Sequence, residues 1–208
     1  MPVITVNHPV ITHKMAILRD MTTSTKKFRE LTSEITLLLT YEATRLMPTE
    51  EVTIQTPMQS MVTHRLLNDG VVITPILRAG LGMVEGMLSI FPAARMAHIG
   101  LKRDEETALP MTYYYNMPPS LEHSTVLVVD PMLATAGSLC AALDLVKKSG
   151  PAEIIALCLI AAPEGAARVE RDHPDVPVYV AAMDECLNEK SYILPGLGDA
   201  GDRMFGTL

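Results

Sequence analysis

Largely aliphatic runs, each leading into a loop and then a helical pattern, constrain the fold of this chain more than any other feature. They are "VVITPIL" at 71–77, "VLVV" at 126–129 and "IIALCLIA" at 154–161. A strand with one face in water alternates apolar and polar residues. These runs do not alternate, which is typical of strands covered on both faces in a parallel sheet. The order strand, loop, helix therefore predicts an α/β fold, with a mostly parallel central sheet flanked by helices.

Two further segments have their own patterns. Residues 24–47 carry apolar side chains at helical spacing behind a Ser/Thr-rich N-cap, and Pro48 closes the segment, so we expect a packing helix. Residues 51–56 alternate like a strand, and residues 60–67 can return beside them, which predicts a β-hairpin arm. The N-terminal "MPVITVNHPVITHK" is interrupted by prolines and polar residues, which argues against a signal peptide.

Composition limits the classes of function. With 208 residues, 48% hydrophobic and 20% charged, the chain can bury an ordinary core, and we expect one domain over 1–208. A formal charge of −7 argues against a nucleic-acid partner, because binding to a phosphate backbone usually needs a basic face. No apolar stretch approaches the length of a membrane span, so we expect no membrane partner and a cytoplasmic location.

Several familiar motifs can be set aside. Cys140, Cys158 and Cys186 are too widely spaced for a paired-cysteine metal site, and we expect each to serve as a small hydrophobic residue. The six histidines lack the spacing of a zinc site. "GLGDAG" at 196–201 matches the dinucleotide fingerprint, yet too few residues follow it for the helix and second strand that such a unit needs.

The loop after residues 126–129 carries the clearest chemical signal. Asp130 ends its predicted strand, and residues 135–138 "TAGS" precede a predicted helix at 139–149. Ligands of open α/β sheets lie beyond the carboxyl ends of strands, and the amides at a helix N-terminus attract anions, so this loop can cradle a phosphate. Arg78 and Arg103 follow two other predicted strands. Each feature alone also fits an ordinary loop or surface residue, but their shared position at strand ends favours a binding site.

At this point the residues match a known family. "VVDPMLATAGS" resembles the phosphoribosyl diphosphate (PRPP) motif of the type I phosphoribosyltransferases. "STKKFREL", "TPILRAGLGM" and "LNEKSYILPGLGDAGDRMFGT" are similar to segments of the uracil phosphoribosyltransferase branch, and the resemblance spans nearly the whole chain. It implies a pentosyltransferase of pyrimidine salvage, which converts uracil and PRPP to UMP and pyrophosphate. It also implies a core over about 66–182 and a small base-binding hood over about 183–208.

The resemblance implies specific site residues. The catalytic residues would be Asp130, Asp199 and Arg103. The PRPP-binding residues would be Arg78, Arg103, Asp130, Pro131, Met132, Leu133, Ala134, Thr135, Ala136, Gly137, Ser138 and Asp199. The uracil-binding residues would be Ile193, Gly198, Asp199 and Ala200. Mg²⁺ is the implied cofactor, held mainly through PRPP, with no metal ligand assigned to the protein.

The chemistry explains why these residue types are needed. Loss of pyrophosphate builds negative charge on the leaving group and leaves an oxocarbenium-like carbon, so the site needs both signs of charge. Arg78 and Arg103 can bind phosphate oxygens bidentately, while Asp130 can hold a ribose hydroxyl near the cationic carbon. We expect residues 104–120 to form a mobile flap that excludes water from the reacting carbon.

Two positions differ from wider family patterns. Pro131 stands where many type I members have a second acid, as is usual in the uracil branch. Ala136 stands where that branch commonly has glycine. If the backbone there has a positive φ, alanine carries a steric cost that weakens phosphate binding.

Other functions stay open on the sequence. A PRPP-sensing or RNA-binding regulator could keep this fold without catalysis, and a transferase could accept another base, such as a purine. The resemblance also implies a homodimer or larger assembly, and GTP as a candidate effector.

Overall fold

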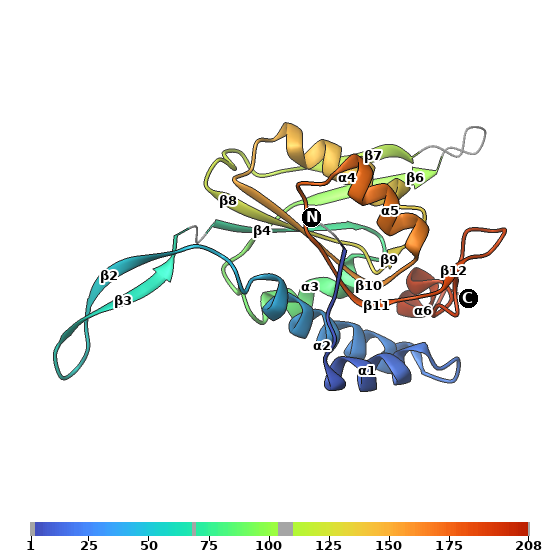
Figure 1. The fold of residues 1–208 in the computed structure, drawn as a ribbon, viewed down its shortest axis with the longest axis horizontal. Helices are drawn as coiled ribbons and strands as arrows, with labels where there is room; N and C mark the ends of the chain where they lie inside the picture. The colour runs from blue at the N-terminus through green and yellow to red at the C-terminus, as the bar shows by residue number, and fades with distance from the viewer. Residues whose placement is uncertain (1–2, 68–69, 104–109, 208) are drawn as a thin grey trace.

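A mostly parallel sheet forms the centre of the computed structural model, which describes residues 3–67, 70–103 and 110–207. Its strand order is β1-β11-β10-β8-β4-β6-β7, and every pairing along this path is parallel except that of β6 with β7 (Figure 1). The strands are β1 (Val3–Thr5), β4 (Gly70–Leu77), β6 (His98–Arg103), β7 (Pro110–Asn116), β8 (Ser124–Val129), β10 (Glu153–Ala161) and β11 (Val178–Met183), with the short β5 (Arg95–Met96) and β9 (Met132–Leu133) beside β4 and β10. The predicted fold class is confirmed.

Helices cover both faces of this sheet (Figure 1). One face carries α1 (Pro9–Arg19), α2 (Thr25–Ala43) and α3 (Leu81–Leu88), and the other carries α4 (Gly137–Lys148) and α5 (Pro163–Asp172). All six residues of β8 are buried, as are Val71 to Ile76 of β4. Strands buried on both faces have no solvent side, which explains the largely aliphatic runs.

The helix predicted over residues 24–47 is α2, and it ends earlier than expected. Ser24 caps its start by accepting a hydrogen bond from the Lys27 backbone N–H at 3.4 Å. The helix ends at Ala43, so the expected end at residue 47 is wrong, and Leu46, beyond the helix, is 82% exposed. The chain must turn before Pro48, because a proline disfavours helical backbone in the residue before it.

Helix α1 is absent from the sequence patterns described above. His8 caps it, since its Nδ1 accepts a hydrogen bond from the Val10 N–H at 3.1 Å, and Pro9 occupies the first turn. Proline at that position lacks only an N–H that would have no partner within the helix. Proline, which would interrupt the interior of a helix, therefore fits the first turn of α1.

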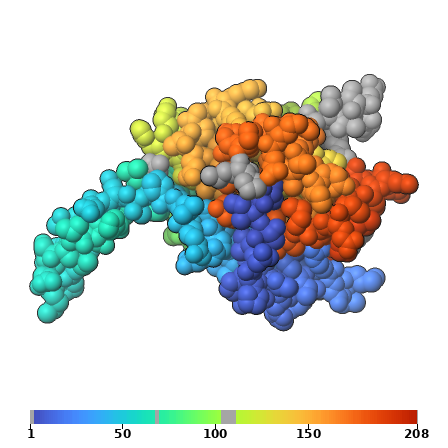
Figure 2. Space-filling model, viewed as in Figure 1, coloured from blue at the N-terminus to red at the C-terminus, as the bar shows by residue number. Residues whose placement is uncertain are grey.

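The predicted β-hairpin arm is confirmed. Strands β2 (Thr49–Gln55) and β3 (Ser60–Leu66) pair antiparallel, with Thr49 opposite Leu66. The arm extends away from the body, at the opposite end of the molecule from the C-terminal segment (Figures 1 and 2). That segment holds the short antiparallel pair β12 (Cys186–Leu187) and β13 (Ile193–Leu194), followed by α6 (Ala200–Phe205).

Three smaller expectations have mixed outcomes. Cys140 and Cys158 are buried as predicted, but Cys186 is exposed, because it lies on a two-residue strand outside the main sheet. Within the predicted flap, residues 110–116 form strand β7, whereas residues 104–109 lie outside the described residues. None of the helices in the described residues combines the length and apolar character that a membrane crossing needs.

Candidate active site at the carboxyl ends of the strands

The loops that follow β4 and β8 lie together, because these two strands are neighbours in the sheet. Pro75 of β4 is paired with Val129 of β8, so Arg78 and Asp130 follow the same edge. Gly80 allows the first loop to pack tightly, since a Cβ at this position would lie 2.6 Å from the Val129 carbonyl oxygen. Any residue other than glycine at position 80 would push the Arg78 loop away from Asp130. The peptide bond between Leu77 and Arg78 is cis.

Asp130 sits in an unusual electrostatic environment. Burial raises the pKa of its carboxyl to about 7, offset only partly by the backbone N–H of Met132, which donates to Oδ1 over a long 3.5 Å. No ion pair to Asp130 occurs among the described side chains. A carboxyl that merely fixed a loop would accept shorter hydrogen bonds. A desolvated carboxyl at a strand end is instead typical of a functional site.

The segment from Pro131 to Ser138 has the geometry of an anion-binding loop. Ala136 adopts a left-handed conformation, with φ 60° and ψ 8°, directly before the first residue of α4. No side chain caps the start of α4, and Thr135, Gly137 and Ser138 are partly exposed. The first amides of this 12-residue helix therefore face an approachable surface, as they do in phosphate-binding loops.

A cavity of about 390 Å³ joins these loops to the C-terminal segment. Asp199, on its rim, also caps α6 by accepting a hydrogen bond from the Asp202 N–H at 2.9 Å. The cavity is lined by Arg78, Ala79, Met132, Ala134, Lys190, Ser191, Tyr192, Gly198, Asp199, Ala200 and Gly201.

The structure thus brings residues from all three predicted sets to one place. Arg78, Met132 and Ala134 line the cavity beside three residues of the uracil set, Gly198, Asp199 and Ala200. Ile193 does not line it, because its side chain is buried in the core on β13. Arg103 is the last residue of β6, next to β4 in the sheet. Asp130 and residues 135–138 lie on the same loop as Met132 and Ala134, outside the cavity wall.

Several residues around the site were not predicted. Lys190, Ser191 and Tyr192 line the cavity, and they belong to the C-terminal stretch that resembles the family, so a closer comparison of that stretch would have found them. Arg19 and Asp184 form an ion pair, and both form hydrogen bonds to the backbone of Gly196 in the neighbouring loop. Nothing in the local sequence marks this pair, because its members are distant in the chain.

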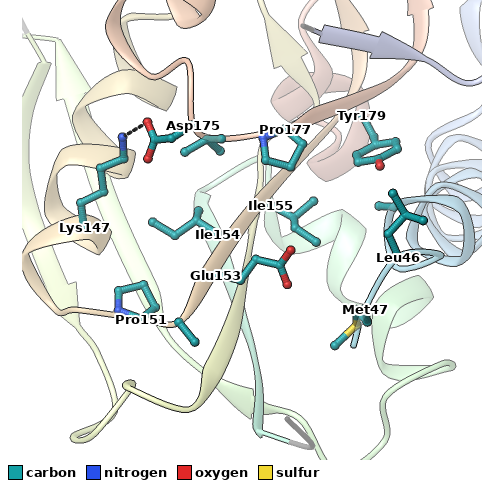
Figure 3. Close-up of a pocket in the computed structure, with 13 residues that line it drawn as sticks. Leu46, Met47, Lys147, Pro151, Glu153, Ile154, Ile155, Asp175, Pro177 and Tyr179 are labelled. Atoms are coloured by element: carbon teal, nitrogen blue, oxygen red, sulfur yellow. Dashed lines mark hydrogen bonds and ion pairs between the residues drawn. The ribbon is translucent and has the colours of Figure 1, made fainter. Parts of the chain in front are cut away.

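A larger cavity, of about 480 Å³, lies at the opposite edge of the sheet (Figure 3). It is formed by the amino ends of β10 and β11 and the end of α2, and the ion pair between Lys147 and Asp175, at 2.6 Å, closes one side. Ligands of open α/β sheets bind beyond the carboxyl ends of strands. The smaller cavity is therefore the candidate active site.

The site fits Mg²⁺ that arrives with a phosphate ligand. The described residues contain no cluster of three His, Cys, Asp or Glu side chains that would form a protein cage for a metal ion. Mg²⁺ is commonly held by one or two carboxylates together with substrate phosphates. Asp130 suits this role, because its desolvated carboxyl lacks a compensating positive charge among the described groups.

Comparison with known proteins assigns the family. A uracil phosphoribosyltransferase family model matches residues 4–207. The uracil phosphoribosyltransferase of Symbiobacterium thermophilum is 55% identical over 205 residues, covering 99% of this chain and 98% of that protein. The AQ2163 protein from Aquifex aeolicus has a solved structure that matches with a TM-score of 0.92 and 39% identity, over 98% of this chain and 97% of its own. Hypoxanthine phosphoribosyltransferase from Trypanosoma cruzi, at 16% identity and a TM-score of 0.51 over 79% of this chain and 77% of its own, shares the type I phosphoribosyltransferase fold. This chain belongs to the uracil phosphoribosyltransferase family.

Proposed function

We propose which residues of this site bind PRPP and which bind uracil. The family match assigns to the chain the pentosyltransferase activity of a uracil phosphoribosyltransferase. The loop from Asp130 to Ser138, with Arg78 and Arg103, binds PRPP. The C-terminal segment around Ile193 and residues 198–200 binds uracil. The observation that carries this proposal is the single cavity that both segments line.

The 5′-phosphate of PRPP binds at the start of α4. The left-handed Ala136 turns the chain so that the amides of residues 136–138 begin the helix, and no side chain competes for them. Thr135 and Ser138 add hydroxyl donors. A phosphate fixed there holds the ribose in place for attack at its anomeric carbon.

The pyrophosphate end of PRPP carries most of its negative charge. Arg78 lines the cavity, and Arg103 is the last residue of β6, which neighbours the strand that leads to Arg78. Arginine at these two positions suits the leaving oxygens, because guanidinium groups bind phosphate bidentately. Asp130 and the PRPP phosphates would hold Mg²⁺, which would supply further neutralisation of charge on the leaving group. Asp130 in its charged form accepts a ribose hydroxyl and faces the positive charge that develops on the sugar.

Uracil is small and nearly neutral, so close backbone contacts must recognise it. Gly198 has a positive φ of 79° and lines the cavity beside Ala200, which favours close approach by a base. Asp199 lies between them, toward the ribose and the attacking nitrogen. In the reaction a bond from that nitrogen to the anomeric carbon forms, the bond to pyrophosphate breaks, and the proton of the nitrogen passes to the Asp199 carboxylate.

The direct test follows pyrophosphate release and UMP formation from PRPP with Mg²⁺ across a panel of bases. Uracil should react, whereas cytosine, adenine and hypoxanthine should react poorly or not at all. Equal turnover of uracil and cytosine would contradict the proposed base site. Absence of turnover with every base, together with tight PRPP binding, would favour the regulator alternative.

The cellular context is part of the same proposal. All three cysteines are free, and two of them are buried, which suits the reducing cytoplasm. The exposed arm supports a homodimer or larger assembly, because an isolated two-stranded hairpin gains little stability alone in water.

We also propose that residues 183–208 act as a base-binding hood on a single domain. GTP is a candidate effector, which is tested by adding GTP to the assay.

A further inference from the structure

Helix α5 packs directly against the back of the proposed phosphate loop. A Cβ on Gly165 would lie 2.2 Å from the Ala134 carbonyl oxygen and 2.9 Å from that of Leu133. Such distances leave no room for a side chain, so the backbones of α5 and the loop are in contact. One turn further along α5, Arg168 is close enough to reach the same loop.

Arg168 donates a hydrogen bond from Nη1 to the Thr135 carbonyl oxygen at 3.2 Å. A Cβ on Gly137 would lie 3.8 Å from the same Nη1, so the guanidinium lies beside the first residue of α4. Asp172, four residues later on α5, lies 3.5 Å from Arg168 Nε and steadies the side chain from the other side. Arg168 is therefore hydrogen-bonded to the residue before Ala136 and lies beside the residue after it.

Ala136 needs such support because it occupies an unfavourable backbone region. Left-handed backbone costs a residue with a Cβ roughly 1–2 kcal/mol relative to the right-handed region. Rotation of the peptide after Thr135 would relieve that cost, but it would also turn the Thr135 carbonyl away from Arg168. The hydrogen bond thus opposes the movement that would disorganise the loop amides.

We propose that Arg168 is a positioning residue for PRPP, which holds the phosphate loop in its binding conformation through the Thr135 carbonyl. The inference rests on the proposed function, because it assumes that this loop binds the 5′-phosphate. Arg168 does not line the cavity of the active site, so it acts through the loop and not by touching the substrate.

The first test replaces Arg168 by methionine, which keeps the stem and removes the donor. The KM for PRPP should rise roughly tenfold, as expected for losing one hydrogen bond from a charged group, while kcat and the KM for uracil change less than about twofold. Arg171→Met is the matched control, because Arg171 lies on the same helix and, among the described side chains, forms hydrogen bonds only to Asp172. It should leave all three constants unchanged.

Direct binding separates positioning from general attraction of anions. Titration calorimetry with ribose 5-phosphate should show roughly tenfold weaker binding to Arg168→Met than to Arg171→Met, while pyrophosphate binds both equally. Equal ribose 5-phosphate affinity in the two variants would overturn the proposal. So would an equal loss for both anions, which would indicate a long-range charge effect.

A second variant pair tests the link to Ala136. In Arg168→Met, adding Ala136→Gly should recover part of the lost PRPP affinity, because glycine adopts the left-handed region without external support. Effects that simply add in the double variant would overturn the proposed coupling. If Arg168→Met does not fold, Arg168→Lys against Arg171→Lys makes the same comparison, with a smaller loss expected at position 168.

The wild-type assay keeps this test distinct from that of the function itself. Failure of the wild-type protein to form UMP would contradict the proposed function. An active wild type whose Arg168 and Arg171 variants behave alike would contradict only the positioning role.

Discussion

Arg19 and Asp184 lie 165 residues apart in the chain and form a bidentate ion pair, with Nη1 to Oδ2 at 2.8 Å and Nη2 to Oδ1 at 2.5 Å. Both also hold Gly196, since Arg19 donates to its carbonyl at 2.7 Å and Asp184 accepts from its N–H at 2.8 Å. The pair thus joins the end of α1 and the end of β11 to the loop that begins the proposed uracil site.

Arg19→Met should damage both stability and uracil binding. The Asp184 side chain is only 3% exposed, and removing one partner of a buried ion pair costs about 3–5 kcal/mol because the other charge is left unpaired. Thermal unfolding should therefore shift down by roughly 6–20 °C. The KM for uracil should rise more than the KM for PRPP, because Gly196 loses its support.

The double variant Arg19→Met/Asp184→Leu is the control for that experiment. Replacing both charges by apolar groups removes the unpaired carboxylate, so the double variant should be more stable than Arg19→Met alone. A double variant that is less stable than the single one would show that Asp184 acts mainly through Gly196 and not through Arg19.

Asp130→Asn should separate catalysis from stability. Asparagine keeps the size of the side chain and removes the charge, so the rate should fall by about 10- to 1000-fold, the scale of losing one preorganised electrostatic contact. The folded protein should be slightly more stable at pH 8, because a desolvated negative charge is gone. Enzyme assays and thermal unfolding on the same sample check both; a less stable variant with near-normal turnover would mean that Asp130 is structural.

The raised pKa of Asp130, about 7, also predicts a pH profile. Since the ordinary value is about 3.9, the folded state prefers the protonated form, and its stabilising contribution is complete below about pH 4 and lost as the pH rises through 7. Activity should move in the opposite direction, because the charged form is the one proposed to serve catalysis. The kcat/KM for PRPP should rise toward pH 7 and then level off.

Asp130→Asn provides the reference for that profile, because it retains the ionisations of PRPP and of the remaining protein. Its residual activity should lack the rise near pH 7, and its stability should vary less with pH between 4 and 7. A profile with the same inflection in both proteins would assign the ionisation to another group.

The arm should mediate self-association. Met58 and Val62 are 90% and 60% exposed on or near its strands, and apolar side chains on an unsupported hairpin need a partner surface. Met58→Ser/Val62→Ser should weaken the assembly measured by sedimentation velocity. Met21→Ser, at a side chain 92% exposed outside the arm, should leave it unchanged, and equal effects of the two changes would exclude a specific role for the arm.

Local sequence patterns were enough to predict the parallel sheet and the loop that follows Asp130. Fully buried strands and amphipathic helices leave local patterns, because burial acts on every residue of the element. The same reasoning located residues 135–138 at the start of a helix. The sequence patterns do not predict α1, whose segment is interrupted by prolines and polar residues, and they extend α2 to residue 47 because apolar spacing alone does not mark where a helix ends.

Tertiary structure alone decided which distant groups support the site. The ion pair of Arg19 with Asp184, the contact of Arg168 with Thr135, and the desolvation of Asp130 each depend on elements brought together by the sheet. Such contacts leave no periodic signal, because each involves one side chain and a partner far along the chain. The left-handed backbone of Ala136 is of the same kind: the packing around the loop imposes it on a residue that would avoid it in isolation.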